Sequence, residues 1–362
     1  MKTTIQRNLI PIVMLLATTA CGSSGTSFSL SEQGQSFKQD ASSFNNQVDL
    51  LWVVDNSASM DPLQNNMTSN FSSFITQFVT KGYDFHLGVT TTDAYLADAA
   101  FDNTPSYAKL RDGVGSTHTG VFDILPTTPN LINVFVTNAS QGGTGSGDER
   151  AFSSLRSALN SSQNAGFHRT GAYLAIIILS DEDDFSSASR IEDSWLYSHG
   201  VADHNYSYSG LDSVSMYTDY LDTLTASQAS ARKYSVSAIT VKDSTCQQSH
   251  VAQSPSSIIG QRYIQMAAAT NGVVGSICDT SYASTLNQIQ QNIVELSTQF
   301  YLTKTPDPTT IVVSVNGVSI PQNSTNGWTY ISASNAIEFH GTAVPQQGAD
   351  ISVNFTPSSL SF

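Results

Sequence analysis

The sequence predicts an α/β protein, built as a doubly wound, mostly parallel sheet flanked by helices and followed by a small all-β sandwich. Between residues 47 and 302, apolar β-rich runs alternate with helical stretches, which is the pattern of a parallel sheet covered by helices. Two of these runs, at 48–54 and 172–179, are apolar on both faces, as buried parallel strands are. After Pro306 and Pro308 the helical pattern stops. We therefore predict two folded domains, at 47–302 and 308–362.

The elements of the first domain follow from hydrophobic periodicity. The run from Val48 to Val54 ends at Asp55, and the next stretch places Leu63, Met67 and Phe71 at three- and four-residue spacing, which predicts a helix. Long insertions are expected near 94–119 and 186–230. The predicted strands are 48–54, 85–91, 120–124, 172–179 and 234–241, and the predicted helices are 62–80, 148–160, 213–225, 258–270 and 281–298.

The second domain is predicted to contain strands alone. Residues 303–308 form a linker because of their prolines. Asn316-Gly317 stands between two β-rich runs, which is a strong hairpin signal. Further strands are expected at 328–331, 336–340 and 349–355.

The N-terminus has the layout of a signal peptide over residues 1–20. Lys2 and Arg7 precede a short apolar run, and small residues lead to Cys21, as in secreted proteins. The run is too short to cross a bilayer, and no later segment approaches about 18 consecutive apolar residues.

The segment Leu16-Ala17-Thr18-Thr19-Ala20-Cys21 resembles the bacterial lipobox, although Thr18 stands where that family prefers Leu. The resemblance implies lipidation of Cys21; the alternative is a cysteine that lies by chance near an ordinary cleavage site. Residues 22–46 contain eight serines and no periodicity, so 21–46 is predicted to be a flexible, lipid-anchored tether. Because Gly22 follows the cysteine, we expect a cell-envelope protein anchored in the outer membrane of a Gram-negative bacterium.

The charge of the chain excludes some partners. Removal of residues 1–20 takes away Lys2 and Arg7, which leaves 15 − 2 = 13 basic against 29 acidic residues, a net charge of −16. Nucleic acid and anionic lipid are poor partners for such a surface, so membrane contact is expected only through the anchor. An acidic surface suits solubility and also attracts divalent cations.

Two cysteines remain when Cys21 is acylated, namely Cys246 and Cys278. An even pair in an oxidising compartment predicts a disulfide. It would close a loop of about 30 residues, worth roughly 3–4 kcal/mol. Two free buried thiols are the alternative.

The motif that carries chemistry is Asp55-Asn56-Ser57-Ala58-Ser59-Met60, where the first strand gives way to a helix. Ligands of open α/β sheets bind at this carboxyl end of the strands. Asp55, Ser57 and Ser59 alternate along the loop and offer carboxylate and hydroxyl oxygens, which suit a hard divalent cation. The alternative is that Asp55 and Ser57 only cap the following helix.

This motif resembles the metal-ion-dependent adhesion site (MIDAS) of the von Willebrand factor type A (VWA) domain, a Rossmann-like fold, and the resemblance covers residues 47–302. The family adds a distant Thr and a distant Asp to Asp-x-Ser-x-Ser. The resemblance implies Asp181 as the distant Asp, because it follows the apolar strand 172–179. It implies Ser146, six residues before Phe152, at the place of the Thr, with Thr144 as the alternative. Asp183 and Asp184 are expected to form a solvated acidic loop.

The resemblance also implies a function. In this family the metal, Mg²⁺ or alternatively Ca²⁺ or Mn²⁺, has a vacant position that is filled by a carboxylate of a protein ligand. We therefore expect adhesion-type binding. The aromatic residues of the second insertion, such as Trp195 and Tyr206, are expected either to anchor a partner or to pack on their own domain.

An enzyme is the rival class of protein. The sequence has no His-Glu-x-x-His, no Gly-x-Ser-x-Gly and no phosphate-binding glycine loop, and its seven histidines form no recognisable triad, so we expect no catalysis. A scaffold subunit of an envelope complex and, third, a metal-dependent hydrolase are the alternatives.

Overall fold

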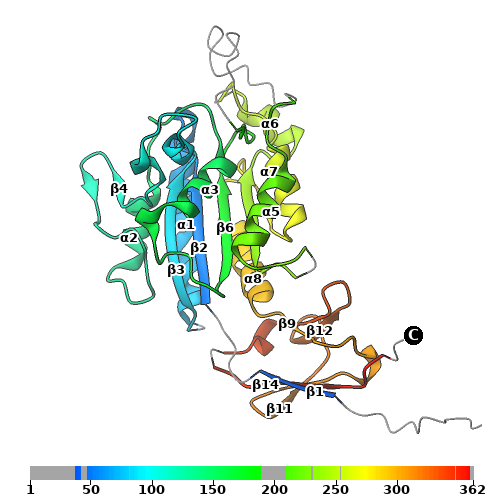
Figure 1. Cartoon of the computed structure of the whole chain (residues 1–362). Helices are drawn as coiled ribbons and strands as arrows, with labels where there is room; N and C mark the ends of the chain where they lie inside the picture. The colour runs from blue at the N-terminus through cyan, green and yellow to red at the C-terminus, as the bar shows by residue number, and fades with distance from the viewer. Residues whose placement is uncertain are drawn as a thin grey trace, which may run out of the picture. The chain divides into compact units, whose positions relative to one another are not determined.

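The computed structural model describes most of the chain and is shown in Figure 1. The predicted signal peptide, Cys21 and the aromatic residues at 195–208 lie outside the described residues. Those described are 37–41, 47–80, 82–188, 209–229, 231–252, 254–346 and 348–358.

A five-stranded parallel sheet forms the centre of the α/β domain, with strand order β3-β2-β6-β7-β8. Every residue of β6, and every residue of β2 except the first, is buried, which explains their continuous apolar sequence. The strands are β2 Gln47–Val54, β3 Asp84–Thr91, β6 Tyr173–Leu179, β7 Tyr234–Thr240 and β8 Val274–Ser276.

Helices cover both faces of this sheet, as Figure 1 shows. On one face, Trp52 packs against Phe71, Phe74 and Phe135 from α1 and α2. On the other face, Phe152 of α3 contacts aromatic rings of α5 and α7. The helices are α1 Asp61–Thr80, α2 Leu131–Ala139, α3 Ala151–Asn160, α5 Val214–Leu224, α6 Ser244–His250, α7 Gln261–Ala269 and α8 Ala283–Ser297. Within the described residues, no helix combines the length and apolar character that a membrane span requires.

The structure corrects one predicted strand. Residues 120–124 make a single antiparallel bridge between Ile124 and Leu87 at the edge of the sheet. Gly120 has a positive φ of 71°, so the backbone turns at the start of the run and does not extend along the edge. The first insertion instead holds short 3-10 helices at Ala94–Ala97 and Pro105–Ala108 and a two-residue hairpin, β4 Gly113–Val114 and β5 Thr117–His118.

The C-terminal region consists of two antiparallel sheets, with orders β1-β14-β10-β11 and β12-β13-β9. The predicted hairpin at Asn316-Gly317 is confirmed, and both residues have the positive φ of such a turn, 50° and 77°. The strands are β9 Phe300–Tyr301, β10 Val312–Val315, β11 Val318–Ile320, β12 Gly327–Ile331, β13 Ala336–His340 and β14 Ile351–Phe355.

The first strand, β1 Phe37–Ala41, lies inside the segment predicted as a flexible tether. It pairs with β14 over the whole of its length, from Phe37 opposite Phe355 to Ala41 opposite Ile351. A partner so distant in sequence leaves no local signal, so composition alone predicts a tether. The β region is therefore built from strands that precede the α/β domain in the sequence and from strands that follow it.

The predicted disulfide is confirmed. Cys246 and Cys278 are bonded, with Cα atoms 5.6 Å apart. The bond ties α6 to the segment that follows β8.

Candidate cation site

Asp55 and Asp181 lie side by side at the carboxyl edge of the sheet. Val54, the last residue of β2, stands opposite Leu179, the last residue of β6, and the Asp55 amide donates to the Leu179 carbonyl at 2.9 Å. Both aspartates are fully buried. The two aspartates that the sequence singled out are therefore neighbours at the topological edge where α/β proteins bind ligands.

A chain of hydrogen bonds connects these aspartates with the two predicted serines. The Ser57 and Ser59 hydroxyl oxygens are 3.1 Å apart, and the Ser59 hydroxyl donates to Asp181 Oδ1 at 3.0 Å. Asp55 Oδ1 accepts the Ser57 amide at 2.8 Å, and Asp55 Oδ2 accepts the Ser180 hydroxyl at 2.7 Å. Four of the five predicted site residues are thus brought together.

The electrostatics of the cluster suit a cation. Burial, together with the negative charge of Asp181, raises the pKa of Asp55 to about 8. A cation placed between the two carboxylates would relieve both effects, since it replaces lost hydration and opposes their repulsion. Among the residues that the structure describes, no group of three or more His, Cys, Asp or Glu side chains is placed to hold a metal. The hydroxyls of Ser57 and Ser59 would therefore have to complete the site.

His250 is a neighbour of the site that sequence reasoning missed. It ends α6, it is buried, and its Nε2 lies 3.2 Å from Asp181 Oδ2. His250 and Ser59 thus contact different oxygens of the Asp181 carboxylate. No sequence signal links the two residues, which stand 69 positions apart.

Gln64 of α1 joins the Asp55 loop to the glycine-rich segment 141–147. Its Nε2 donates to the carbonyls of Asp55 and Gly142 at 2.9 and 3.0 Å, and its Oε1 accepts the amides of Gln141 and Gly142 at 2.9 and 3.0 Å. The sequence did hold a signal for this role, because Gln64 is a polar residue on the apolar stripe formed by Met60, Met67 and Phe71.

Two glycines allow the close approach of these segments. A Cβ atom on Gly145 would lie 2.3 Å from Asn56 Nδ2, and one on Gly143 would lie 2.9 Å from the Ala58 Cα. The Gly145 amide also donates to the Asn56 carbonyl at 2.8 Å. The glycine-rich segment therefore packs directly on the loop that carries Ser57 and Ser59.

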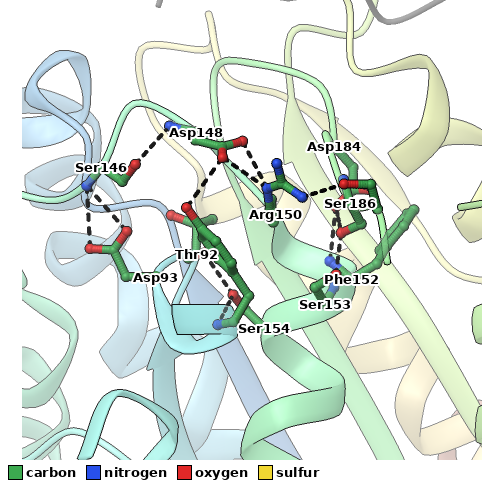
Figure 2. Close-up of polar contacts among 12 residues, drawn as sticks. Thr92, Asp93, Ser146, Asp148, Arg150, Phe152, Ser153, Ser154, Asp184 and Ser186 are labelled. Carbon is green, nitrogen blue, oxygen red and sulfur yellow. Dashed lines mark hydrogen bonds and ion pairs between the residues drawn. The ribbon is translucent and has the colours of Figure 1, made fainter. Parts of the chain in front are cut away.

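The structure does not join Ser146 to the other four residues. Its amide donates to Asp93 Oδ1 at 3.1 Å and its hydroxyl accepts the Asp148 amide at 3.0 Å, as Figure 2 shows. The competing hydroxyl, that of Thr144, belongs to an exposed residue of the same segment.

The prediction that Asp183 and Asp184 form a solvated loop is wrong, because both are buried. Asp184 accepts the Phe152 amide at 2.9 Å at the start of α3 and pairs with Arg262 of α7 at 3.2 Å. Asp183 accepts the Arg262 amide at 2.9 Å, and burial raises its pKa to about 7. These aspartates fix the loop after β6 to two helices.

In the comparison with known proteins, this chain matches solved structures but no family model and no curated protein sequence. The chain is similar to the pilus adhesin SpaC from Lactobacillus rhamnosus GG in its open conformation, with a TM-score of 0.41, 12% identity, and coverage of 90% of this chain and 41% of that chain. It is also similar to proximal thread matrix protein 1 from the mussel byssus, with a TM-score of 0.38, 11% identity, and coverage of 74% and 52%. This chain thus spans about half or less of the proteins that it matches.

Proposed function

We propose that this chain is a cell-envelope binding protein whose α/β domain holds a divalent cation, with Mg²⁺ as first choice and Ca²⁺ or Mn²⁺ as alternatives. The cation would present an open coordination position to a carboxylate of a protein partner. The residues that would hold it are Asp55, Ser57, Ser59 and Asp181.

One observation carries this proposal: two buried carboxyls stand at neighbouring strand ends, where Asp181 accepts the Ser59 hydroxyl, the Ser59 hydroxyl contacts that of Ser57, and Asp55 accepts the Ser57 amide. Hard cations select such oxygen donors, and hydroxyls add no charge of their own. The arrangement offers oxygen ligands, and the imidazole of His250 contacts the Asp181 carboxylate and not a serine hydroxyl. Binding is therefore the activity that we propose, and not catalysis.

Calorimetric titration of the protein with Mg²⁺ tests the site. The wild type should bind one ion, and Asp55→Ala should abolish the binding heat. Asp219→Asn is the matched control, because it removes one carboxylate charge from an exposed position on α5 and should leave the affinity unchanged. Equal cation affinity in the wild type and Asp55→Ala would refute the proposal.

Partner capture tests the role of the cation. Candidate partner surfaces should retain the wild type in Mg²⁺ and release it on addition of chelator, whereas Asp55→Ala should not bind under either condition. A partner held equally well with chelator present would instead indicate a scaffold subunit.

The envelope location rests on the proposed lipid at Cys21. Mass spectrometry of the membrane-extracted protein should show an acylated Cys21 at its N-terminus, and Cys21→Ser should move the protein to the soluble fraction. An unmodified Cys21 in the extracted protein would contradict the anchor and leave the cation site as an independent proposal.

A further inference from the structure

A third aspartate, Asp93, is buried at the carboxyl edge of the sheet, and the sequence did not predict a role for it. It follows β3, which ends at Thr91 beside the end of β2. Its Oδ2 accepts the side-chain amide of Asn56 at 3.0 Å. The backbone amide of Ser146 lies 3.1 Å from its Oδ1 and 3.3 Å from its Oδ2. Two N–H donors from two different segments thus engage this buried carboxylate.

Asn56 directly follows Asp55 and lies inside the loop of the proposed cation site. Both ends of its side-chain amide are engaged: Nδ2 donates to Asp93, and Oδ1 accepts the Thr92 hydroxyl at 3.3 Å. Its backbone carbonyl accepts the Gly145 amide at 2.8 Å. These contacts fix the backbone between the first and the second of the proposed ligands.

The contacts of Asp93 close a ring of hydrogen bonds. The ring runs from Asp93 to the Asn56 side chain, and from the Asn56 carbonyl to the Gly145 amide. The next amide along the chain, that of Ser146, returns to Asp93. Gln64 joins the glycine-rich segment to the loop at residues 141 and 142, and the ring joins them again at residues 145 and 146. The segment is therefore held on the loop at two places.

Asp93 is itself fixed by the sheet and by α3. The Thr92 amide donates to the Val54 carbonyl at 3.2 Å, which extends the pairing of β2 with β3. The Thr92 carbonyl accepts the Ser154 hydroxyl of α3 at 2.6 Å. Figure 2 shows the Asp93 carboxylate directed from this base toward the Ser146 amide. A group held by regular secondary structure positions its partners more precisely than a group on a free loop.

We propose that Asp93 is a positioning residue of the cation site. By fixing Asn56 it holds the loop 55–59, which carries three of the four proposed ligands, and by fixing Ser146 it holds the glycine-rich segment against that loop. This inference rests on the proposed function and adds a residue that acts on the site without touching the cation. Ligands that are already ordered bind more tightly, because the cost of ordering them is not taken from the affinity. Loss of a group that orients metal ligands typically weakens metal binding by roughly 10–100-fold.

Exchange of the Asp93 and Asn56 side chains tests this role by calorimetric titration with MgCl₂. Asp93→Asn has an NH₂ group in place of one oxygen, so it must turn a donor toward one of its two N–H partners, and Mg²⁺ binding should weaken by roughly tenfold or more. Asn56→Asp places two carboxylates face to face and should also weaken binding. The double variant, Asn56→Asp with Asp93→Asn, restores each hydrogen bond of the ring with the same net charge, so it should regain the wild-type affinity.

Asp98→Asn is the matched control for these variants. It removes a carboxylate of the same insertion, one that accepts the Ala100 amide at 2.8 Å within its own turn. The Mg²⁺ affinity of this control should equal that of the wild type. Weakening as large as in Asp93→Asn would show that any lost charge in the insertion has this effect, and would overturn the inference.

Thermal unfolding in chelator separates positioning from stability alone. If Asp93→Asn lowers the Tm but binds Mg²⁺ like the wild type, the role is structural, which overturns the inference and leaves the proposed function standing. A double variant that binds as weakly as Asp93→Asn, or Asn56→Asp binding more tightly than the wild type, overturns it as well. Absence of cation binding by the wild type overturns both proposals. If Asp93→Asn does not fold, Asn56→Ala removes the side chain that Asp93 fixes; weaker binding by that variant supports the inference, and wild-type affinity overturns it.

Discussion

Loss of the disulfide between Cys246 and Cys278 should destabilise the α/β domain and weaken its cation site together. The bond closes a loop with a sequence separation of 32, and the loop-entropy relation then gives about 3.7 kcal/mol at 25 °C. α6 contains only seven residues, too few for a stable isolated helix. Since α6 ends at His250, which contacts Asp181, loosening it should also free the Asp181 carboxylate.

Scanning calorimetry of the double variant Cys246→Ala and Cys278→Ala, in chelator, measures the first effect. Unfolding entropy of about 2.1 cal/mol/K per residue over about 250 residues converts 3.7 kcal/mol into a fall in Tm of roughly 7 °C. Titration with Mg²⁺ should show weaker binding. A reductant should lower the Tm of the wild type by the same amount and leave the double variant unchanged. A double variant that melts within roughly 2 °C of the wild type would refute the reasoning.

Three further perturbations test the packing around the site. Phe71→Ala removes a ring stacked on Phe135 at 3.5 Å and should cost about 3–5 kcal/mol in denaturant unfolding; a loss below about 1 kcal/mol would contradict a tight core. Arg150→Lys loses the forked contacts to Asp148 and Ser187 and should lower the free energy of unfolding by roughly 2–3 kcal/mol, whereas unchanged stability would show that these contacts contribute nothing. Asp112 and the Gly115 carbonyl raise the pKa of His118, so the contact stabilises the β4–β5 hairpin below the ordinary histidine pKa, and this stabilisation is lost as pH rises through the raised value. NMR titration should show the pKa of His118 falling in Asp112→Asn, and an unchanged value would contradict the pairing.

The sequence allowed prediction of the sheet edge that carries the site because its strands are continuous apolar runs. Runs that end at Asp55 and just before Asp181 predict buried parallel strands, and the carboxyl ends of such strands meet at one edge. The hairpin at Asn316-Gly317 was predictable because its turn requires a positive φ at two successive residues, and few residue pairs adopt that conformation readily.

Other features depend on partners that are remote in sequence. The sequence around Asp183 and Asp184 predicts a solvated loop. Both are buried, and both contact Arg262, which lies 79 and 78 residues further along the chain. Ser146 was selected by a spacing rule, which does not show that its amide and hydroxyl are engaged by Asp93 and Asp148. His250 was not predicted because its helix, α6, has only seven residues, which is too short for a hydrophobic periodicity to reveal it.

The pairing of β1 with β14 sets the order in which the molecule can be completed. Phe37 and Phe355, which face each other, are 355 − 37 = 318 residues apart, and the α/β domain is synthesised between them. At ribosomal rates of about 5–20 residues per second, β1 waits unpaired for roughly 15–60 s until β14 has been made. A unit folded in between shortens the effective loop that the two strands must close. Assembly of this molecule should therefore begin in the middle of the chain and finish at its two ends.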